Sequence, residues 1–407
     1  MDYKRILEEV DGIDPMDGTI QFLMANYGQP RDAFIRGEGS YLIREDGSRV
    51  LDFLSGIAVT SLGHSYPPVV DAISNQAHKL MHTSNFFANE SGPKVAYIID
   101  QLISSSTTAH VGGKVFFSNS GAEAMEAAIK LARRRQGRNR YGFITINGAF
   151  HGRTLGALSA TAQPGKKEAF EPVVPGFHHV EAGDIEGVAR LIAAGDIGAV
   201  IIESIQGESG VRPLSRDFVR SLRAMTEESD TLLILDEVQT GLARCGSWFD
   251  FSNHEITPDI VVMAKALGSG FPIGATWARS SVASAFVAGD HGTTYGGNPL
   301  ATASALATLI SMIKIDAPSR ARELGLEMVR RLESLDGVVE VRGRGLLLGV
   351  ELSGVEAGSV AKFALEGGLI VNPIGASTIR IAPPITVSID EIEEAIRILG
   401  DAIKLAR

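Results

Sequence analysis

Two charged residues end apolar runs of the sequence, where buried strands often present reactive groups. Lys265 closes the run DIVVMAK, and Asp236 closes the preceding run TLLILD. Lysine is rarely buried without a partner, and its amine can form an imine with a carbonyl group. A nearby carboxylate can keep a pyridinium nitrogen protonated, so that the ring accepts electrons. The alternatives are a lysine that has reached the surface at a strand end and an aspartate that caps the next turn.

A third candidate lies between the apolar run KVFFS and the helical pattern AEAMEAAIKLARRR. There Ser120, Gly121 and Ala122 stand at a predicted helix start. Backbone N–H groups at a helix start bind phosphate, helped by the helix dipole, and glycine lets the backbone approach a ligand closely. The alternative is an ordinary serine cap with Glu123 in the first turn.

Other catalytic motifs are missing from the sequence. It has no GxxxxGK[ST] phosphate loop and no GxSxG nucleophile elbow. The segment GRGLLLG at 343–349 has the wrong glycine spacing for a dinucleotide fingerprint, and His254-Glu255 is followed by Pro258 where a zinc motif needs histidine. The pair His178-His179 is interpreted as part of a loop. We therefore expect no metal site.

The elements that position these residues alternate between strand and helix. Strands are predicted at 114–118, 143–147, 199–204, 231–237 and 259–265, and a helix at 215–228 separates two of them. This alternation predicts an α/β fold with a mostly parallel sheet and helices on both faces. Sites in such sheets lie beyond the carboxyl ends of the strands, which is where the candidate residues stand.

The two flanks differ from this central region. Residues 37–56 predict a hairpin with its turn at Asp46-Gly47. After about residue 305 the sequence predicts long helices, two strands within 338–352 and a last helix from Ile389. This part is expected to form a smaller α+β domain.

Composition limits the partners of the protein. The 407 residues suggest about two or three packed units. The net charge of −10 and the lack of a basic run disfavour nucleic-acid binding, and no apolar run approaches the roughly 20 residues of a membrane span. A single cysteine, Cys245, and a charged N-terminus without a signal-peptide core indicate a reducing compartment. We expect the cytoplasm, although an organelle matrix fits equally.

Taken together, these segments resemble the class III aminotransferases, which are fold-type I pyridoxal-phosphate enzymes. The resemblance extends from LDFLSGIAV near residue 51 to IRIAPPI near residue 379. Within the class, the motifs SGIAVTSLGHSYP, NSGAEAMEAAIKLAR, FHGRTLGALSATAQ, DEVQTG and HGTTYGGNPLA most resemble the acetylornithine aminotransferases.

The resemblance implies a role for each matching residue. Lys265 would hold pyridoxal 5′-phosphate as an imine and act as the proton-transfer base, and Asp236 would pair with the ring nitrogen. Ser120, Gly121 and Ala122 would cradle the phosphate, and Thr294 would reach the phosphate of the neighbouring subunit in a homodimer with shared sites. The other cofactor-binding residues would be Phe150 and Val238 on the two ring faces, Gln239 near the ring hydroxyl, and Glu237.

The resemblance also implies how substrates are held. Arg153 would bind the distant carboxylate and Arg380 the α-carboxylate of glutamate, since arginine suits bidentate recognition of carboxylates. Glu203 would cover Arg380 when an ω-amino donor is bound, and Thr293 would line the substrate end. Taken alone, Arg153 would more often be a surface residue at a helix start, and Arg380 an exposed charge on an edge strand.

The implied enzyme has a large domain with a mostly parallel seven-stranded sheet at 71–304 and a smaller α+β domain at 305–407, which residues 1–70 join. Its reaction would be the transfer of an amino group from N2-acetylornithine to 2-oxoglutarate, in arginine biosynthesis. The alternatives are succinylornithine, ornithine, 4-aminobutyrate or a carrier-linked lysine as donor, and a non-catalytic ligand-binding module. One departure from the family bears on the site, because Ser204 stands where proline usually follows Glu203.

Overall fold

A seven-stranded sheet forms the centre of the computed structural model, which describes residues 6, 9–109 and 111–407. Its strand order is β4-β12-β11-β10-β7-β5-β6, and all strands run parallel except β12, which is antiparallel to both neighbours. The mostly parallel seven-stranded sheet expected from the sequence is thus confirmed. The strands are β4 (Gly113–Ser118), β5 (Gly142–Ile146), β6 (Phe177–Val180), β7 (Ile197–Ile202), β10 (Leu232–Asp236), β11 (Ile260–Met263) and β12 (Gly274–Arg279).

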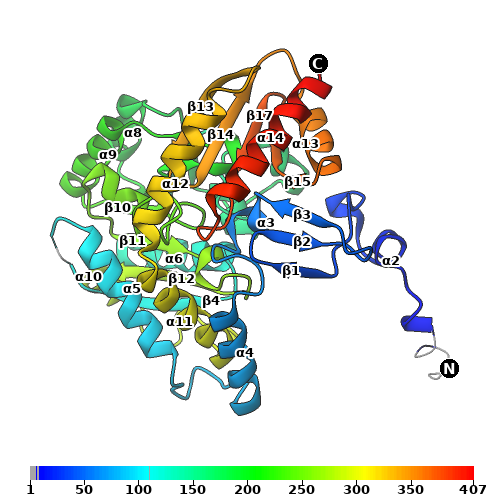
Figure 1. Ribbon diagram of the computed structural model, residues 1–407. Coiled ribbons are helices and arrows are strands. Elements are labelled where there is room, and N and C mark those ends of the chain that lie inside the picture. Colours follow the sequence, from blue (N-terminus) through cyan, green and yellow to red (C-terminus); the bar gives the residue numbers. More distant parts are fainter. Residues whose placement is uncertain (1–5, 7–8, 110) are drawn as a thin grey trace.

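The central strands are buried on both faces. Successive side chains point to opposite sides of a sheet, so each strand contributes residues to two cores. Along β10, Leu232 and Ile234 belong to the core that includes α6 (Gly121–Gln136). Leu233 and Leu235 belong to the core on the other face. Helices α5 (Gly92–Ser106) and α9 (Arg216–Glu228) contribute to this second core, so the sheet is covered on both sides (Figure 1).

Two smaller sheets lie beside the central one (Figure 1). The first is antiparallel, in the order β13-β14-β17-β16, and the second has the order β1-β2-β3-β15. Strand β15 pairs with β3, which ties the N-terminal hairpin to the C-terminal part of the chain, while the division into domains at 70 and 304 stays a prediction. The strands are β1 (Arg36–Glu38), β2 (Tyr41–Ile43), β3 (Arg49–Asp52), β13 (Val338–Arg344), β14 (Leu347–Leu352), β15 (Leu369–Ile370), β16 (Asn372–Ile374) and β17 (Thr378–Ile381), and β8 (Ile205–Gln206) pairs with β9 (Arg212–Pro213).

Local signals explain two of the expected boundaries. The hairpin of β2 and β3 turns at Asp46-Gly47, where Gly47 has φ +83° and the Asp46 carboxylate accepts the Ser48 N–H at 2.8 Å. Helix α14 begins at Ile389 because Ser388 and Glu391 form a capping box. The interpretation of His178-His179 as a loop was wrong, since both residues lie in the edge strand β6.

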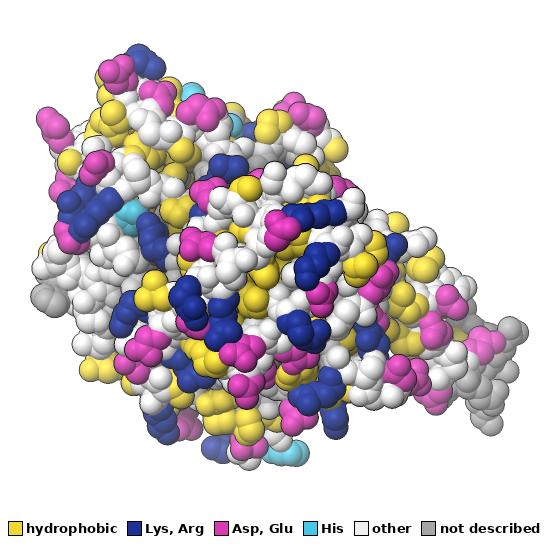
Figure 2. Space-filling view, turned by 45° about the horizontal axis from the view of Figure 1, so that its top comes forward, with side chains coloured by type: hydrophobic (Ala, Val, Ile, Leu, Met, Phe, Trp, Pro, Cys, Tyr) yellow, Lys and Arg dark blue, Asp and Glu magenta, His cyan; other side chains and the backbone are white. Residues whose placement is uncertain are grey.

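The remaining helices surround these sheets, and the surface carries charges of both signs. Figure 2 shows acidic and basic side chains interspersed over one face. No single helix in the described part of the chain is long and apolar enough to cross a membrane, and α11 with α12 reaches that length only as a pair bent by 66°. The other helices are α2 (Pro15–Phe22), α3 (Ser55–Ala58), α4 (Pro67–Lys79), α7 (Leu155–Ala160), α8 (Ile185–Ala193), α10 (Ser280–Ala283), α11 (Pro299–Lys314), α12 (Ala317–Leu332) and α13 (Ala357–Glu366).

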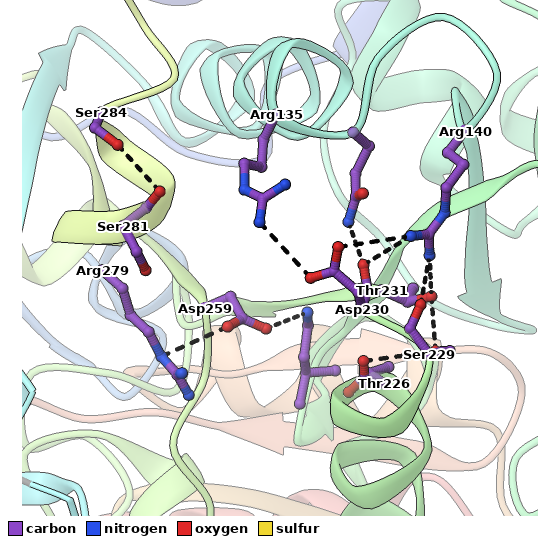
Figure 3. A network of polar contacts seen from close by, with 12 residues as sticks. Arg135, Arg140, Thr226, Ser229, Asp230, Thr231, Asp259, Arg279, Ser281 and Ser284 are labelled. Carbon is purple, nitrogen blue, oxygen red and sulfur yellow. Dashed lines mark hydrogen bonds and ion pairs between the residues drawn. The ribbon is translucent and has the colours of Figure 1, made fainter.

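A network of hydrogen bonds and ion pairs connects the segments just before the parallel strands (Figure 3). Arg140, just before β5, donates hydrogen bonds to the segment just before β10, including the Thr231 hydroxyl at 2.8 Å. Asp259, just before β11, accepts the N–H of Leu233 at 2.8 Å and pairs with Arg223 at 2.6 Å. The site therefore lies at the other ends of these strands, their carboxyl ends.

Candidate active site

A cavity of about 430 Å³ opens at the carboxyl ends of the parallel strands. Segments that follow β4, β5, β7, β10 and β11 line it, because parallel strands end at the same edge of a sheet. The cavity brings together most of the residues predicted from the sequence, namely Ser120, Gly121, Ala122, Phe150, Arg153, Glu203, Asp236, Val238, Gln239 and Lys265.

Lys265 stands just beyond β11, at the first residue of the short 3-10 helix η6 (Lys265–Leu267). Its φ of +42° is uncommon for a residue with a side chain, and the surrounding structure must hold it there. Burial lowers the pKa of the Lys265 amine to about 8, against the opposing influence of nearby carboxylates such as Glu208. A substantial fraction of the amine is therefore neutral near pH 8, as a nucleophile requires.

Asp236 is buried at the end of β10 and is held by two hydrogen bonds. Its Oδ2 lies 2.8 Å from Nδ1 of His151, and its Oδ1 accepts the N–H of Val238 at 3.1 Å. Burial lowers the pKa of His151, but the hydrogen bond to Asp236 and the negative charges around it outweigh this, so its pKa lies above the usual value. The imidazole fixes the direction in which the carboxylate faces the cavity.

The start of α6 forms a cradle at one end of the cavity. Ser120 caps the helix by accepting the N–H of Glu123 at 3.2 Å, while the N–H groups of Gly121 and Ala122 have no acceptor among the described residues. A Cβ added to Gly121 would lie 3.0 Å from both methyl groups of Val238, so glycine is needed for this close packing. Free N–H groups at a helix start suit a phosphate.

Arg380 lies deep in the site, on β17, with a side chain only 2% exposed. Its Nη1 pairs with Glu208 Oε1 at 2.5 Å and also donates to Gln239 Oε1 at 3.1 Å. Its Nη2 donates to Asn372 at 2.9 Å. The guanidinium is therefore covered by a carboxylate in this structure.

The identity of that carboxylate corrects one expectation, because Glu203 does not pair with Arg380. Glu203 follows β7 directly, and its Oε2 accepts the N–H of Phe150 at 2.9 Å. The pKa of Glu203 is raised to about 7, mainly by burial; His151 opposes this shift and the charge of Asp236 adds to it. Glu208 reaches Arg380 instead because it stands on the turn between β8 and β9, within the short helix η4 (Gly207–Ser209).

Besides Arg380, which lies behind Glu208 and Gln239, three other predicted residues do not line the cavity. The carboxylate of Glu237 points away from it and accepts the N–H groups of Asp250 and Phe251, at 3.1 and 2.8 Å. Successive residues after a strand face opposite ways, so Asp236 and Glu237 cannot both line the site. Thr293 and Thr294 line a neighbouring hollow of about 760 Å³.

The sequence interpretation missed His151 and Glu208. His151 directly follows Phe150 and has no distinctive spacing of its own, and its contact with Asp236 spans 85 positions of the chain. Glu208 stands in IQGES, five residues after the glutamate that was chosen. The signal was present there, since two glutamates follow the same strand, but their directions depend on the turn between β8 and β9.

The cavity fits pyridoxal phosphate, the cofactor that the resemblance implies. It combines a helix start with free N–H groups, a buried carboxylate at a second point and a lysine of lowered pKa at a third. Phe150 and Val238 supply apolar walls. Its volume lies within the usual range for sites that bind small molecules, about 300–1,000 Å³.

Known proteins resemble the chain over nearly its whole length. Residues 24–403 match the model of the family described as aminotransferase class-III. An acetylornithine aminotransferase of Aquifex aeolicus is 43% identical over 94% of this chain and 100% of the relative. The acetylornithine aminotransferase of Bacillus subtilis is 39% identical over 94% of this chain and 97% of the relative.

Solved structures give the same result for the fold. An ornithine aminotransferase from Toxoplasma gondii has a TM-score of 0.91 at 27% identity, covering 98% of this chain and 97% of the other. An acetylornithine aminotransferase from Elizabethkingia anophelis has a TM-score of 0.82 at 29% identity, covering 96% of this chain and 98% of the other. A second structure of the Toxoplasma gondii enzyme, with a TM-score of 0.90, is described with pyridoxal phosphate at partial occupancy in its active site.

Proposed function

The chain belongs to the class-III aminotransferase family of pyridoxal-phosphate enzymes, and we propose that it transfers the side-chain amino group of N2-acetylornithine to 2-oxoglutarate. The products are N-acetylglutamate 5-semialdehyde and glutamate. The observation that carries this proposal is a cavity that holds Arg153, Lys265 and Glu208, with the buried Arg380 paired to Glu208 behind the cavity wall. The donors named for the relatives at about 40% identity support the same choice.

We assign the cofactor to the three points of the cavity already described. Ser120, Gly121 and Ala122 would hold the phosphate, Asp236 would pair with the ring nitrogen, and Lys265 would bind the aldehyde group. When bound, pyridoxal phosphate supplies a carbonyl that takes up the amino group and a ring that accepts electrons from the reacting carbon. Phe150 and Val238 would enclose the two ring faces, and Gln239, which accepts a hydrogen bond from Arg380, would lie near the ring hydroxyl.

With the cofactor bound, Lys265 would serve as the base and then the acid of the reaction. Its amine would take up a proton from the substrate carbon and later give a proton back. The pKa of about 8 suits both tasks, because proton transfer is most efficient with a group that titrates near the working pH. Asp236, oriented by His151, would keep the ring nitrogen protonated.

The two arginines distinguish the two substrates. Arg153 binds the far carboxylate of either substrate, while Arg380 binds the α-carboxylate of glutamate or 2-oxoglutarate. When an N-acylated ornithine is bound, no carboxylate reaches Arg380, and Glu208 neutralises it. An uncovered charge beside an apolar methylene chain would be costly.

We also propose a homodimer in which Thr294 of one subunit completes the phosphate site of the other. Thr294 lies outside the cavity of its own subunit, in a hollow that includes Phe86 and His82. Phe86 is 93% exposed, and the nearby side chains of Phe87 and Tyr295 are also largely exposed. Apolar surface of this kind is typical of an interface, and a two-fold axis would place each Thr294 at the other site.

The dimer can be tested by complementation. A Thr294→Ala variant and a Lys265→Ala variant are each expected to be strongly impaired, and mixed dimers would contain one intact site out of two. Recovery of activity after subunit exchange supports shared sites. Mixed dimers, isolated with two different affinity tags, that show no recovery would refute them.

The proposed setting is the cytoplasm, in arginine biosynthesis. The donor is tested by measuring turnover with N2-acetylornithine, succinylornithine, ornithine and 4-aminobutyrate against 2-oxoglutarate. We expect the N2-acylated donors to have the highest kcat/KM. Lys265→Ala should abolish turnover while the circular dichroism spectrum stays unchanged. A folded Lys265→Ala variant with the parent rate would disprove the role of the lysine.

A further inference from the structure

The turn that carries Glu208 is held from outside the cavity by an arginine. Arg342 stands on β13, and its Nε donates a hydrogen bond to the carbonyl of Gly210 at 2.7 Å. Gly210 directly follows η4 and has a left-handed conformation, with φ +97°. The Arg342 side chain is only 9% exposed and lies outside the cavity. It can therefore act on the reaction only through the turn and the strands around it.

The same guanidinium is tied to the strand that carries Arg380. Its Nη2 pairs with Glu351 on β14 at 2.8 Å and donates to the Thr378 hydroxyl on β17 at 2.9 Å. Thr378 in turn donates to Glu351 at 2.7 Å and stands two residues before Arg380. Burial raises the pKa of Glu351, but hydrogen bonds from two hydroxyl groups and the guanidinium outweigh it and lower that pKa to about 2. Glu351 therefore stays ionised and holds the guanidinium in place.

The turn is thus joined to its surroundings on both sides of Glu208. Before it, the carbonyl of Gly207 accepts a hydrogen bond from Arg380 Nη1 at 3.2 Å. After it, the carbonyl of Gly210 accepts the bond from Arg342. The backbone that carries the Glu208 carboxylate is therefore fixed relative to β17 by two arginines, one on each side.

The contact that covers Arg380 is sensitive to the position of this turn. The Glu208 carboxylate lies 2.5 Å from Nη1 of Arg380. A hydrogen bond is lost once its heavy atoms are more than about 3.5 Å apart, so a shift of the turn by roughly 1 Å would open the contact. Glu208 must also leave Arg380 when glutamate binds and return afterwards. A fixed backbone lets the side chain move while its return position stays the same.

We propose that Arg342 is a positioning residue, which fixes the turn so that Glu208 covers Arg380 while an ω-amino donor is bound. This inference rests on the proposed function, since it needs that cover in the donor half-reaction. With glutamate bound, the substrate carboxylate replaces Glu208 at Arg380, so the position of the turn matters less. Arg342 therefore influences the balance of the two half-reactions without contacting either substrate.

A double-mutant cycle tests whether Arg342 acts through Glu208. The readout is kcat/KM for N2-acetylornithine divided by kcat/KM for glutamate, each followed in its own half-reaction by the absorbance of the bound cofactor. We expect Arg342→Met to lower this ratio about fivefold, because residues that act through another change a coupling by roughly 2- to 30-fold. When Arg342→Met is combined with Glu208→Gln, the ratio should equal that of Glu208→Gln alone, since the carboxylate to be positioned is already gone.

Two further variants separate positioning from a general loss of structure. Arg344→Met removes another arginine of β13, which pairs with Asp250 at 2.9 Å and not with the turn, so the ratio should stay at the parent value. Arg342→Lys keeps a cation beside Glu351 and should fold even where Arg342→Met does not. Its single amine lacks the planar fork that serves several acceptors at once, so we expect the ratio to fall about twofold. A general loss of structure would lower both rate constants together and leave the ratio unchanged.

The outcomes separate this inference from the proposed function. If Glu208→Gln lowers the ratio but the folded Arg342 variants keep the parent ratio, the inference is overturned and the proposed function stands. The same holds if the double variant falls a further fivefold below Glu208→Gln. If Glu208→Gln leaves the ratio unchanged, the cover of Arg380 is refuted and the inference fails with it. If N2-acetylornithine does not react but another ω-amine does, the proposed donor is wrong, and the same ratio measured with that amine decides the inference.

Discussion

Replacing Glu208 by glutamine would remove the carboxylate that covers Arg380 while keeping the size of the side chain. Arg380 would retain neutral acceptors on Gln239 and Asn372. With an N2-acylated donor bound, its charge would face the methylene chain without an opposite charge. With glutamate bound, the substrate itself brings a carboxylate to Arg380, and glutamate no longer competes with the Glu208 carboxylate.

The size of the effect follows from the burial of the pair. Breaking a fully buried ion pair costs about 3–5 kcal/mol, whereas exposed pairs contribute about 0–1 kcal/mol. The Arg380 side chain is 2% exposed and that of Glu208 is 24% exposed, so we take an intermediate cost of about 2 kcal/mol. At about 1.4 kcal/mol per factor of ten, this corresponds to a roughly 30-fold lower kcat/KM for the ω-amino donor.

Single-turnover absorbance of the bound cofactor measures each half-reaction separately. Glu208→Gln should slow the half-reaction with N2-acetylornithine and leave the glutamate half-reaction unchanged or faster. Glu203→Gln is the matched control, because Glu203 bonds to the Phe150 backbone and not to Arg380. Equal losses in both half-reactions for Glu208→Gln, or a selective loss for Glu203→Gln, would refute this reasoning.

Three more predictions concern the cofactor site, the pH dependence and the scaffold. Gly121→Ala should raise the dissociation constant of pyridoxal phosphate about tenfold, because its Cβ would lie 3.0 Å from the Val238 methyl groups and overpack the cradle; an equilibrium titration with unchanged affinity would contradict this. Burial raises the pKa of Glu237 to about 8, so the folded protein binds its proton more tightly than the unfolded chain does. The resulting contribution to the free energy of unfolding is fully present below the unfolded pKa of about 4.3 and is lost as the pH rises through 8. Glu237→Gln should therefore flatten the fall in unfolding free energy between pH 5 and 8 in urea titrations, and an unaltered slope would count against it. Asp259→Asn should lower the unfolding free energy by about 3 kcal/mol, because it breaks the buried pair with Arg223, while kcat per folded molecule stays at the parent value; a loss of kcat would show that the two edges of the sheet are coupled.

The sequence predicted the strands that carry the site better than those at the sides. The central residues of such runs, LLIL and IVVM, are all apolar because both faces of the sheet are covered, and they match β10 and β11. Strand β6, with the sequence FHHV, lies at the sheet edge and lacks such a run. Strand β12 contains GATWAR, whose small residues give a weak signal.

Single side chains of the candidate site were likewise predictable only where a strand determines their position. Asp236 and Lys265 were predictable because Asp236 is the last residue of β10 and Lys265 stands two residues beyond β11, so the strands largely determine their positions. The choice between Glu203 and Glu208 depended on a turn that folds back towards β17, which no local pattern encodes. The roles of the predicted residues stay predictions until the variants are measured.

Because β12 runs antiparallel to β11, the segment that joins them can vary in length and sequence without a change in the pairing of the two strands. β11 ends near the cavity and the antiparallel β12 begins there, so residues 264–273 form a single connection at the cavity. Lys265 stands at its beginning, fixed by the strand, while Phe271, Pro272 and Ile273 form cavity wall at its end. Insertions or bulkier residues between these points would reshape the donor pocket without shifting the pairing of Met263 with Ala275. Changes within this connection would therefore alter the cavity wall near Lys265 while the pairing of β11 with β12 stays in place.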